Sequence, residues 1–177
     1  MRNRVIIFAI CSFLLIRCNS KPSLEKYFVE NTENKNFVQV DVSPSILNVQ
    51  KNKLSKSELN VLKSYSKMNV LAFKLNDKNQ LQFETEKSKV IEILKDEKYQ
   101  QLMRFGSGKQ GAQVSYVGDD EHISEFVVFA NSKESGFAIV RVLGKNMNPT
   151  SIMTMLSVLK SSNIDLEQLK PLKDLMK

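Results

Sequence analysis

Histidine, cysteine and tryptophan are scarce in this chain of 177 residues, which contains 1 His, 2 Cys and 0 Trp. These numbers exclude a disulfide framework and a zinc site built from Cys and His side chains. A serine hydrolase would have to use His122 as its base, and the chain has no Gly-x-Ser-x-Gly sequence to present a nucleophile. We therefore predict no metal, no cofactor and no catalytic residue.

Glycine and proline are also few, with 6 Gly and 4 Pro, while 42% of the residues are hydrophobic. This composition excludes collagen-like, low-complexity and wholly disordered chains. The length fits one domain, because domains usually hold about 100 to 200 residues. We place this domain at residues 24–177.

A long hydrophobic run occurs at residues 5–16, directly after a start that carries Arg2 and Arg4. The run is too short to span a membrane, because a transmembrane helix needs about 20 apolar residues. A basic start followed by a short apolar core is typical of a signal peptide. We predict that residues 1–17 are a signal peptide of the lipoprotein type and that the protein is exported.

The sequence Leu15-Ile16-Arg17-Cys18 looks like a bacterial lipobox, in which the cysteine thiol takes a diacylglyceryl group and becomes the first mature residue. Arg17 departs from the small residue that usually precedes the cysteine. Cleavage after Ser20, which would release a soluble protein, is therefore the alternative. We predict lipidation at Cys18, with residues 18–23 as a polar tether and the membrane as a partner through the lipid anchor.

Positive charge exceeds negative charge, with 26 Lys+Arg against 19 Asp+Glu and a net charge of +7. Loss of the signal peptide removes Arg2, Arg4 and Arg17 and no acid, which leaves 23 basic against 19 acidic residues, a balance of +4. The remaining charges are interspersed, and no nucleic-acid-binding module is visible. We predict a solvated surface with no nucleic-acid partner and a weak attraction to anionic lipid head groups.

The mature chain alternates between helical and strand periodicity. Helices are predicted around residues 24–28, 46–47, 59–65, 84–102, 152–159 and 165–169, and Ser55 with Glu58 has the spacing of a capping box. Strands are predicted at residues 37–42, 70–75, 103–105, 112–117, 123–130 and 137–143. Short turn clusters between the last four strands are typical of an antiparallel meander. The predicted fold class is α+β, with a single mixed or mostly antiparallel sheet of about six strands and helices packed mainly on one face.

The segment Gly106-Ser107-Gly108-Lys109-Gln110-Gly111 matches the G-x-G-x-x-G pattern of dinucleotide-binding loops. That function needs a helix directly after the glycines, whose N-terminal N–H groups hold the pyrophosphate. Residues 112–117 instead alternate like a strand. We therefore predict a hairpin loop, in which the glycines serve the turn.

The segment Asp119-Asp120-Glu121-His122 places three acids beside the single histidine. One interpretation is a metal or acid–base site of an exported hydrolase. The other is a solvated hairpin turn, because Asp accepts turn conformations and adjacent side chains on a turn point apart. We favour the turn and keep the hydrolase as the alternative function.

The strands predicted at residues 123–130 and 137–143 carry apolar residues on both faces. This pattern indicates either a second covering layer of helices or an exposed patch that binds a partner. We expect a non-enzymatic binding or interaction module in the cell envelope, with an envelope protein as a possible partner.

Five short motifs carry a family resemblance: Val40-Asp41-Val42-Ser43-Pro44, Val70-Leu71-Ala72-Phe73, Tyr99-Gln100-Gln101-Leu102-Met103, the strand from Glu125 to Phe129, and Val142-Leu143-Gly144. With them the chain resembles the domain-of-unknown-function 4252 family of small exported bacterial proteins, from about Leu24 to Leu169. The resemblance implies a signal-bearing, often lipidated protein of the Gram-negative cell envelope, periplasmic or anchored in the outer membrane. It implies no reaction and no catalytic residues.

Overall fold

The computed structural model describes residues 21–43, 47–48, 54–107, 110–154 and 163–164. The predicted signal peptide and Cys18 lie outside these residues, so their assignment stays a prediction. Within the described ranges, no helix has the length and hydrophobicity needed to cross a membrane.

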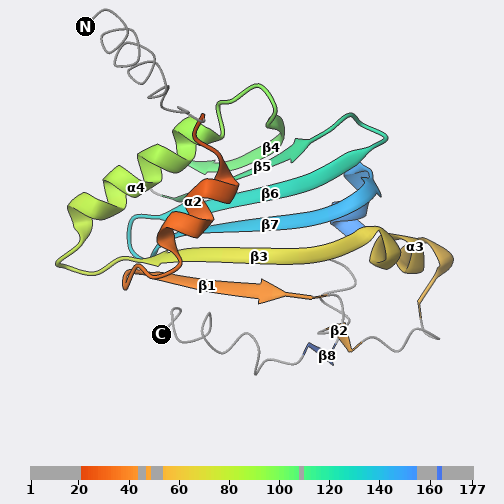
Figure 1. The fold of residues 1–177 in the computed structure, drawn as a ribbon, viewed down its shortest axis with the longest axis horizontal. Helices are drawn as coiled ribbons and strands as arrows, with labels where there is room; N and C mark the ends of the chain where they lie inside the picture. Colours follow the sequence, from red (N-terminus) through yellow and green to blue (C-terminus); the bar gives the residue numbers. More distant parts are fainter. Residues whose placement is uncertain (1–20, 44–46, 49–53, 108–109, 155–162, 165–177) are drawn as a thin grey trace, which may run out of the picture.

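A six-stranded sheet forms the centre of the fold (Figure 1). In spatial order its strands are β1 (Phe37–Val42), β3 (Tyr65–Lys74), β7 (Gly136–Met147), β6 (Ile123–Ser132), β5 (Gln110–Val117) and β4 (Gln100–Ser107). Every pair of neighbours is antiparallel. Strands β4 to β7 follow one another as the predicted meander, and β3 and β1 extend the sheet beyond β7. The α+β class and the single sheet are confirmed.

Two helices, α2 (Leu24–Asn31) and α4 (Gln80–Ile93), cover one face of the sheet (Figure 1). The Ser23 hydroxyl caps α2 by accepting the backbone N–H of Lys26 at 3.3 Å. Phe83 and Val90 of α4 are fully buried. Helices and sheet enclose a first core, whose members from the sheet are Phe37, Leu71, Phe73, Val127, Phe129, Phe137 and Ile139.

Within the described part of the chain, the opposite face is covered at one end by α3 (Lys56–Ser64) and by the helical residues 149–154. The predicted capping box starts α3, because Ser55 N–H donates to the Glu58 carboxylate at 2.8 Å and Glu58 N–H donates to Ser55 Oγ at 3.2 Å. A second core lies here and includes Val61, Phe126, Val142, Met147 and Ile152. Farther along this face the apolar side chains are half-buried, as at Val128, Ala130, Ala138 and Val140.

The chain around residue 47 differs from the prediction of a short helix that carries Ile46 and Leu47. Leu47–Asn48 forms β2, which pairs antiparallel with β8 (Asn163–Ile164). Ile46 lies outside the described residues. The partner strand is more than a hundred positions away in the sequence. Helix propensity depends only on neighbouring residues, so it could not predict hydrogen bonds to such a distant segment.

The turn before β7 depends on Gly136, whose φ is 114°. A Cβ atom at this position would lie 2.0 Å from the backbone oxygen of Phe73 and 3.0 Å from the backbone nitrogen of Leu75. We expect Gly136→Ala to lower the free energy of unfolding by about 1–3 kcal/mol, because the left-handed backbone and its approach to β3 would both have to change. Denaturant unfolding measures this. The control Ser135→Ala, at an exposed position of the same turn, should change it by less than about 0.5 kcal/mol, and equal effects would contradict the prediction.

Candidate ligand-binding cleft

The acidic residues before β6 form an exposed turn. The Asp119 carboxylate accepts the backbone N–H groups of Glu121 at 3.0 Å and His122 at 2.8 Å, and it lies 3.1 Å from Nδ1 of His122. The two backbone hydrogen bonds hold the pKa of Asp119 below its usual range. Asp120 accepts a hydrogen bond from the Tyr116 hydroxyl at 2.7 Å. These carboxylates therefore hold the turn, and within the described residues no group of three or more His, Cys, Asp and Glu side chains is placed to bind a metal.

The described residues of the glycine-rich segment, 106–107 and 110–111, lie on the paired strands of a hairpin, as predicted. Gly106 of β4 lies opposite Gly111 of β5, and β5 continues directly from there as a strand. The segment therefore lacks the helix N-terminus that a dinucleotide-binding loop requires. Gly106 has a φ of 91°, and a Cβ atom there would lie 2.3 Å from the backbone oxygen of Gln110. The hairpin itself thus explains this glycine.

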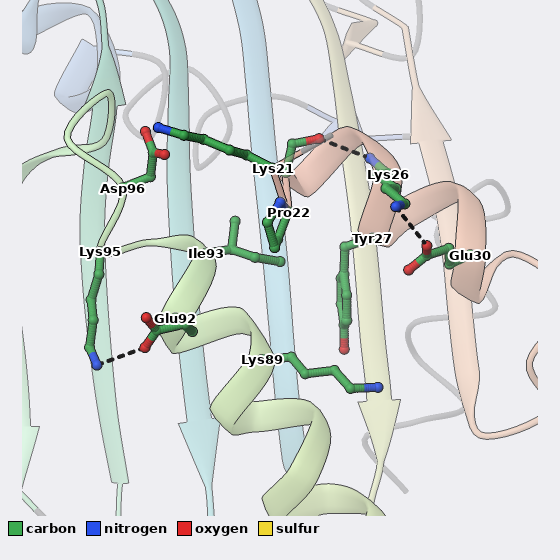
Figure 2. Close-up of a pocket in the computed structure, with 11 residues that line it drawn as sticks. Lys21, Pro22, Lys26, Tyr27, Glu30, Lys89, Glu92, Ile93, Lys95 and Asp96 are labelled. Carbon is green, nitrogen blue, oxygen red and sulfur yellow. Dashed lines mark hydrogen bonds and ion pairs between the residues drawn. The ribbon is translucent and has the colours of Figure 1, made fainter. Parts of the chain in front are cut away.

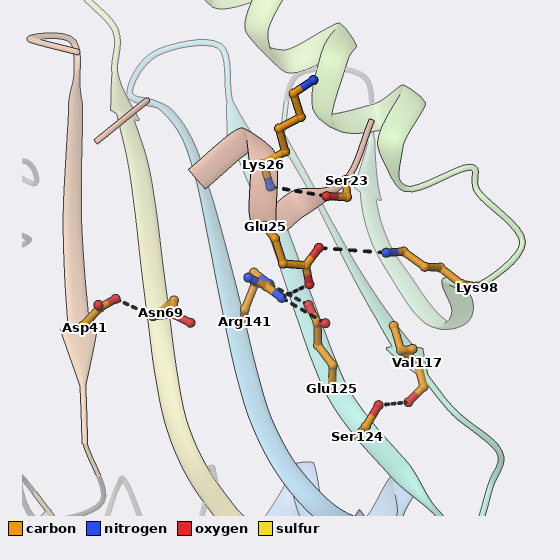
Figure 3. A network of polar contacts seen from close by, with 10 residues as sticks. All are labelled: Ser23, Glu25, Lys26, Asp41, Asn69, Lys98, Val117, Ser124, Glu125 and Arg141. Atoms are coloured by element: carbon orange, nitrogen blue, oxygen red, sulfur yellow. Dashed lines mark hydrogen bonds and ion pairs between the residues drawn. The ribbon is translucent and has the colours of Figure 1, made fainter. Parts of the chain in front are cut away.

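A network of charged side chains lies between α2 and the sheet, and its two sheet residues are buried (Figure 3). Arg141 of β7 donates from Nε to one carboxylate oxygen of Glu125 on β6 at 2.6 Å and from Nη2 to the other at 3.1 Å. The two side chains are only 6% and 8% exposed. Arg141 Nη2 also donates to Glu25 of α2 at 2.5 Å. These three residues, which we call the Arg141 network, connect α2 to the middle of the sheet.

Two residues border the Arg141 network. Lys98 Nζ lies 4.0 Å from the Glu25 carboxylate and 4.8 Å from the ring centroid of Tyr99. Partial burial acts to raise the pKa of Glu25, but its hydrogen bonds and the charges of Arg141 and Lys98 hold that pKa below its usual value. Burial and the charge of Glu125 raise the pKa of Tyr99. Because the opposite charges compensate one another, we assign the network a structural role.

A cleft of about 550 Å³ lies between the start of α2 and the end of α4 (Figure 2). Its charged side chains are of both signs, and two ion pairs form among them. Lys26 Nζ lies 3.8 Å from Glu30, and Lys95 Nζ lies 2.8 Å from Glu92. Exposed pairs of this kind contribute little to stability and leave little net charge. This α2–α4 cleft does not select a ligand of one charge.

A second cleft, of about 660 Å³, lies between α4 and strands β4 to β6, and we call it the α4–β4 cleft. Its volume is within the range of about 300–1,000 Å³ that is usual for small-molecule sites. The described lining contains no carboxylate. Besides Tyr99, its polar side chains are three cations and three amides. The cations are Lys87, Lys95 and Arg104, and the amides are Gln101, Gln113 and Asn131. The α4–β4 cleft therefore has a positive lining.

The α4–β4 cleft also has apolar walls, formed by Ile91 of α4 together with Leu94 and Phe129. Ile91 is 40% exposed, and Leu94 and Phe129 are buried beside it. Phe105 of β4 also borders the cleft, but it pairs with Ala112, one position beyond the Arg104–Gln113 pair, so its side chain points to the opposite face of the sheet.

Two hydrogen bonds on the sheet surface orient Arg104. Its Nη2 donates to the Gln113 side-chain oxygen on the facing strand at 2.6 Å, and the Gln113 amide nitrogen donates to Ser115 Oγ at 3.0 Å. Ser115 is fully buried. Among the described residues, no carboxylate lies in ion-pair contact with Arg104. The guanidinium therefore keeps its charge available to a ligand.

Sequence reasoning missed Arg104, Gln113 and Arg141. Arg104 and Gln113 lie on different strands, and only the β4–β5 register makes them partners. One signal was available in the sequence. After residue 17, arginine occurs only at positions 104 and 141, while lysine is abundant. Arginine has a planar, bidentate donor geometry that lysine lacks, so a rare arginine in a lysine-rich chain points to a specific contact.

Fold and cleft together define a class of protein, an α+β domain with one antiparallel sheet, a buried ion pair beneath a short helix, and a positively lined cleft at the β4–β5 edge. The family model described as Domain of unknown function (DUF4252) matches residues 27–155. The chain belongs to this family, which confirms the resemblance seen in the sequence. No match is found among curated proteins or among solved structures.

Proposed function

We propose that this protein is an exported lipoprotein of the cell envelope, anchored through Cys18, and that its α+β domain has a non-enzymatic binding role. The observation that carries the binding role is the α4–β4 cleft, which combines apolar side chains with cations and amides and has no carboxylate among its described lining residues. Sites for small ligands likewise combine apolar side chains with polar groups that fix the orientation of the ligand. A lipid anchor would hold the cleft near the membrane surface, within reach of envelope ligands and protein partners.

The anchor is supported by the basic and apolar start of the chain and by the position of Cys18 at the end of the apolar run. Only four residues, 19–22, lie between Cys18 and Ser23, the residue that caps α2. The folded domain would therefore begin close to the acyl groups. Lipidation would also consume the thiol, so Cys18 would not serve as a nucleophile.

Growth of the host with an alkyne-labelled fatty acid tests the anchor. We expect the protein to take up the label and partition into detergent, and Cys18→Ala to abolish both, because the thiol is the acceptor. Cys11→Ala is the matched control, since Cys11 lies within the apolar core of the signal, and it should leave labelling unchanged. An unlabelled protein whose mature N-terminus is Lys21 would contradict the proposal and support cleavage after Ser20.

A further inference from the structure

We propose that the α4–β4 cleft binds an anionic amphiphile, a small molecule with one carboxylate or phosphate head and an apolar chain. This inference rests on the proposed binding role and specifies its ligand. Arg104 would bind the head, and the apolar walls of the cleft would bind the chain. The cleft lies between α4 and the hairpin of β4 (Gln100–Ser107) and β5 (Gln110–Val117).

The head group is assigned to Arg104 because no carboxylate of the described residues compensates its charge. The structure records one hydrogen bond of its guanidinium, to the neutral side-chain oxygen of Gln113. A guanidinium has five N–H donors in a planar fork, and the remaining ones match the two oxygens of a carboxylate or phosphate. Gln113 is held in turn by the buried Ser115, so the fork is oriented before any ligand arrives.

The two lysines of the cleft contribute less to the head-group site. Lys87 Nζ pairs with Glu84 at 2.5 Å, and Lys95 Nζ pairs with Glu92 at 2.8 Å. Both acids lie on α4 and partly cancel the lysine charges. The lysines therefore raise the positive potential of the cleft, and Arg104 is the group that selects an anion.

The apolar chain is assigned to the walls that lie on the same side of the sheet as Arg104. Ile91 is 40% exposed, and Leu94 and Phe129 are buried beside it. A ligand chain that covers Ile91 removes its surface from water, which favours binding. Gly106 and Gly111 line the same cleft without side chains that would fill it. The hairpin glycines, which serve no dinucleotide, thus leave room at the end of the cleft.

The test is a titration of the full chain carrying Cys18→Ala, so that its own acyl groups do not compete for the cleft. The probes are decanoate below its micelle concentration, the neutral decanol, and inorganic phosphate, with amide NMR shifts as the measurement. We expect saturable shifts in α4, β4 and β5 with decanoate, and tighter binding of decanoate than of either other probe. Arg104→Gln should weaken decanoate binding about tenfold and leave decanol unchanged, because a hydrogen bond to a charged group is lost.

Lys145→Gln is the matched control. It removes one positive charge at an exposed position of β7 that does not line the cleft, and it should leave decanoate binding unchanged. Equal affinity for decanol and decanoate would overturn the anionic ligand class and leave the binding role intact. No saturable shift with any of the three probes would overturn the binding role itself. Arg104-dependent binding to phosphatidylglycerol vesicles without binding of decanoate would show a membrane contact and contradict the proposal.

Discussion

Arg141→Leu is expected to lower the free energy of unfolding by about 3–5 kcal/mol, because it leaves the Glu125 carboxylate buried without its counter-ion. The two oxygens of Glu125 accept hydrogen bonds from Arg141 at 2.6 and 3.1 Å, and the Glu125 side chain is only 8% exposed. Water therefore cannot replace the lost guanidinium. Denaturant unfolding, with the midpoint and the slope both fitted, measures the change.

Two control variants separate the buried charge from the loss of packing. The double variant Arg141→Leu with Glu125→Leu should lie closer to the natural protein than Arg141→Leu alone, because no unpaired charge then remains in the core. Glu25→Gln should have a smaller effect than Arg141→Leu, since Glu25 is 55% exposed and water solvates it. A loss below about 1 kcal/mol in Arg141→Leu would show that Glu125 does not depend on this partner.

Phe73→Ala should have a similarly large effect, a loss of about 3–5 kcal/mol in the free energy of unfolding. Phe73 of β3 is 2% exposed, and its ring centroid lies 5.1 Å from that of Phe37, 5.4 Å from that of Phe137 and 6.1 Å from that of Phe83. The substitution would leave a cavity at the point where β1, β7 and α4 meet the same side chain. Thermal and denaturant unfolding both measure the loss.

Phe105→Ala is the matched control for Phe73→Ala, because it removes the same side chain from a position that is 57% exposed. We expect it to change the free energy of unfolding by less than about 1 kcal/mol. If the two variants lost equal stability, the first core would not be the centre of the fold that the ring contacts indicate.

Local patterns were enough to predict most of the secondary structure. The alternation in residues 112–117, 123–130 and 137–143 identified strands of the meander, since side chains on a strand point to opposite faces in turn. The spacing of Ser55 and Glu58 identified the start of α3, because the two hydrogen bonds of a capping box join residues three positions apart. Leu47 was assigned wrongly, because β2 exists only through its distant partner β8.

The candidate cleft could not be predicted in the same way. Arg104 and Gln113 are nine positions apart on different strands, and Ile91 reaches the cleft from a helix that precedes both strands. Residues of this kind come together through the register of a hairpin and the packing of a helix on a sheet. Neither is encoded in a spacing along the chain, so the scarcity of arginine was the one sign of a site that the sequence offered.

Sequence alone therefore established the α+β class, the meander and the family, and it yielded the prediction of an export signal and of lipidation at Cys18. These conclusions depend on neighbours in the chain, where periodicity, capping and turn residues act over a few positions. The tertiary structure alone showed that Arg141 and Glu125 share a buried pair and that Arg104 faces a cleft with apolar walls. Burial and charge compensation depend on which distant residues surround a group, and only the folded chain decides that.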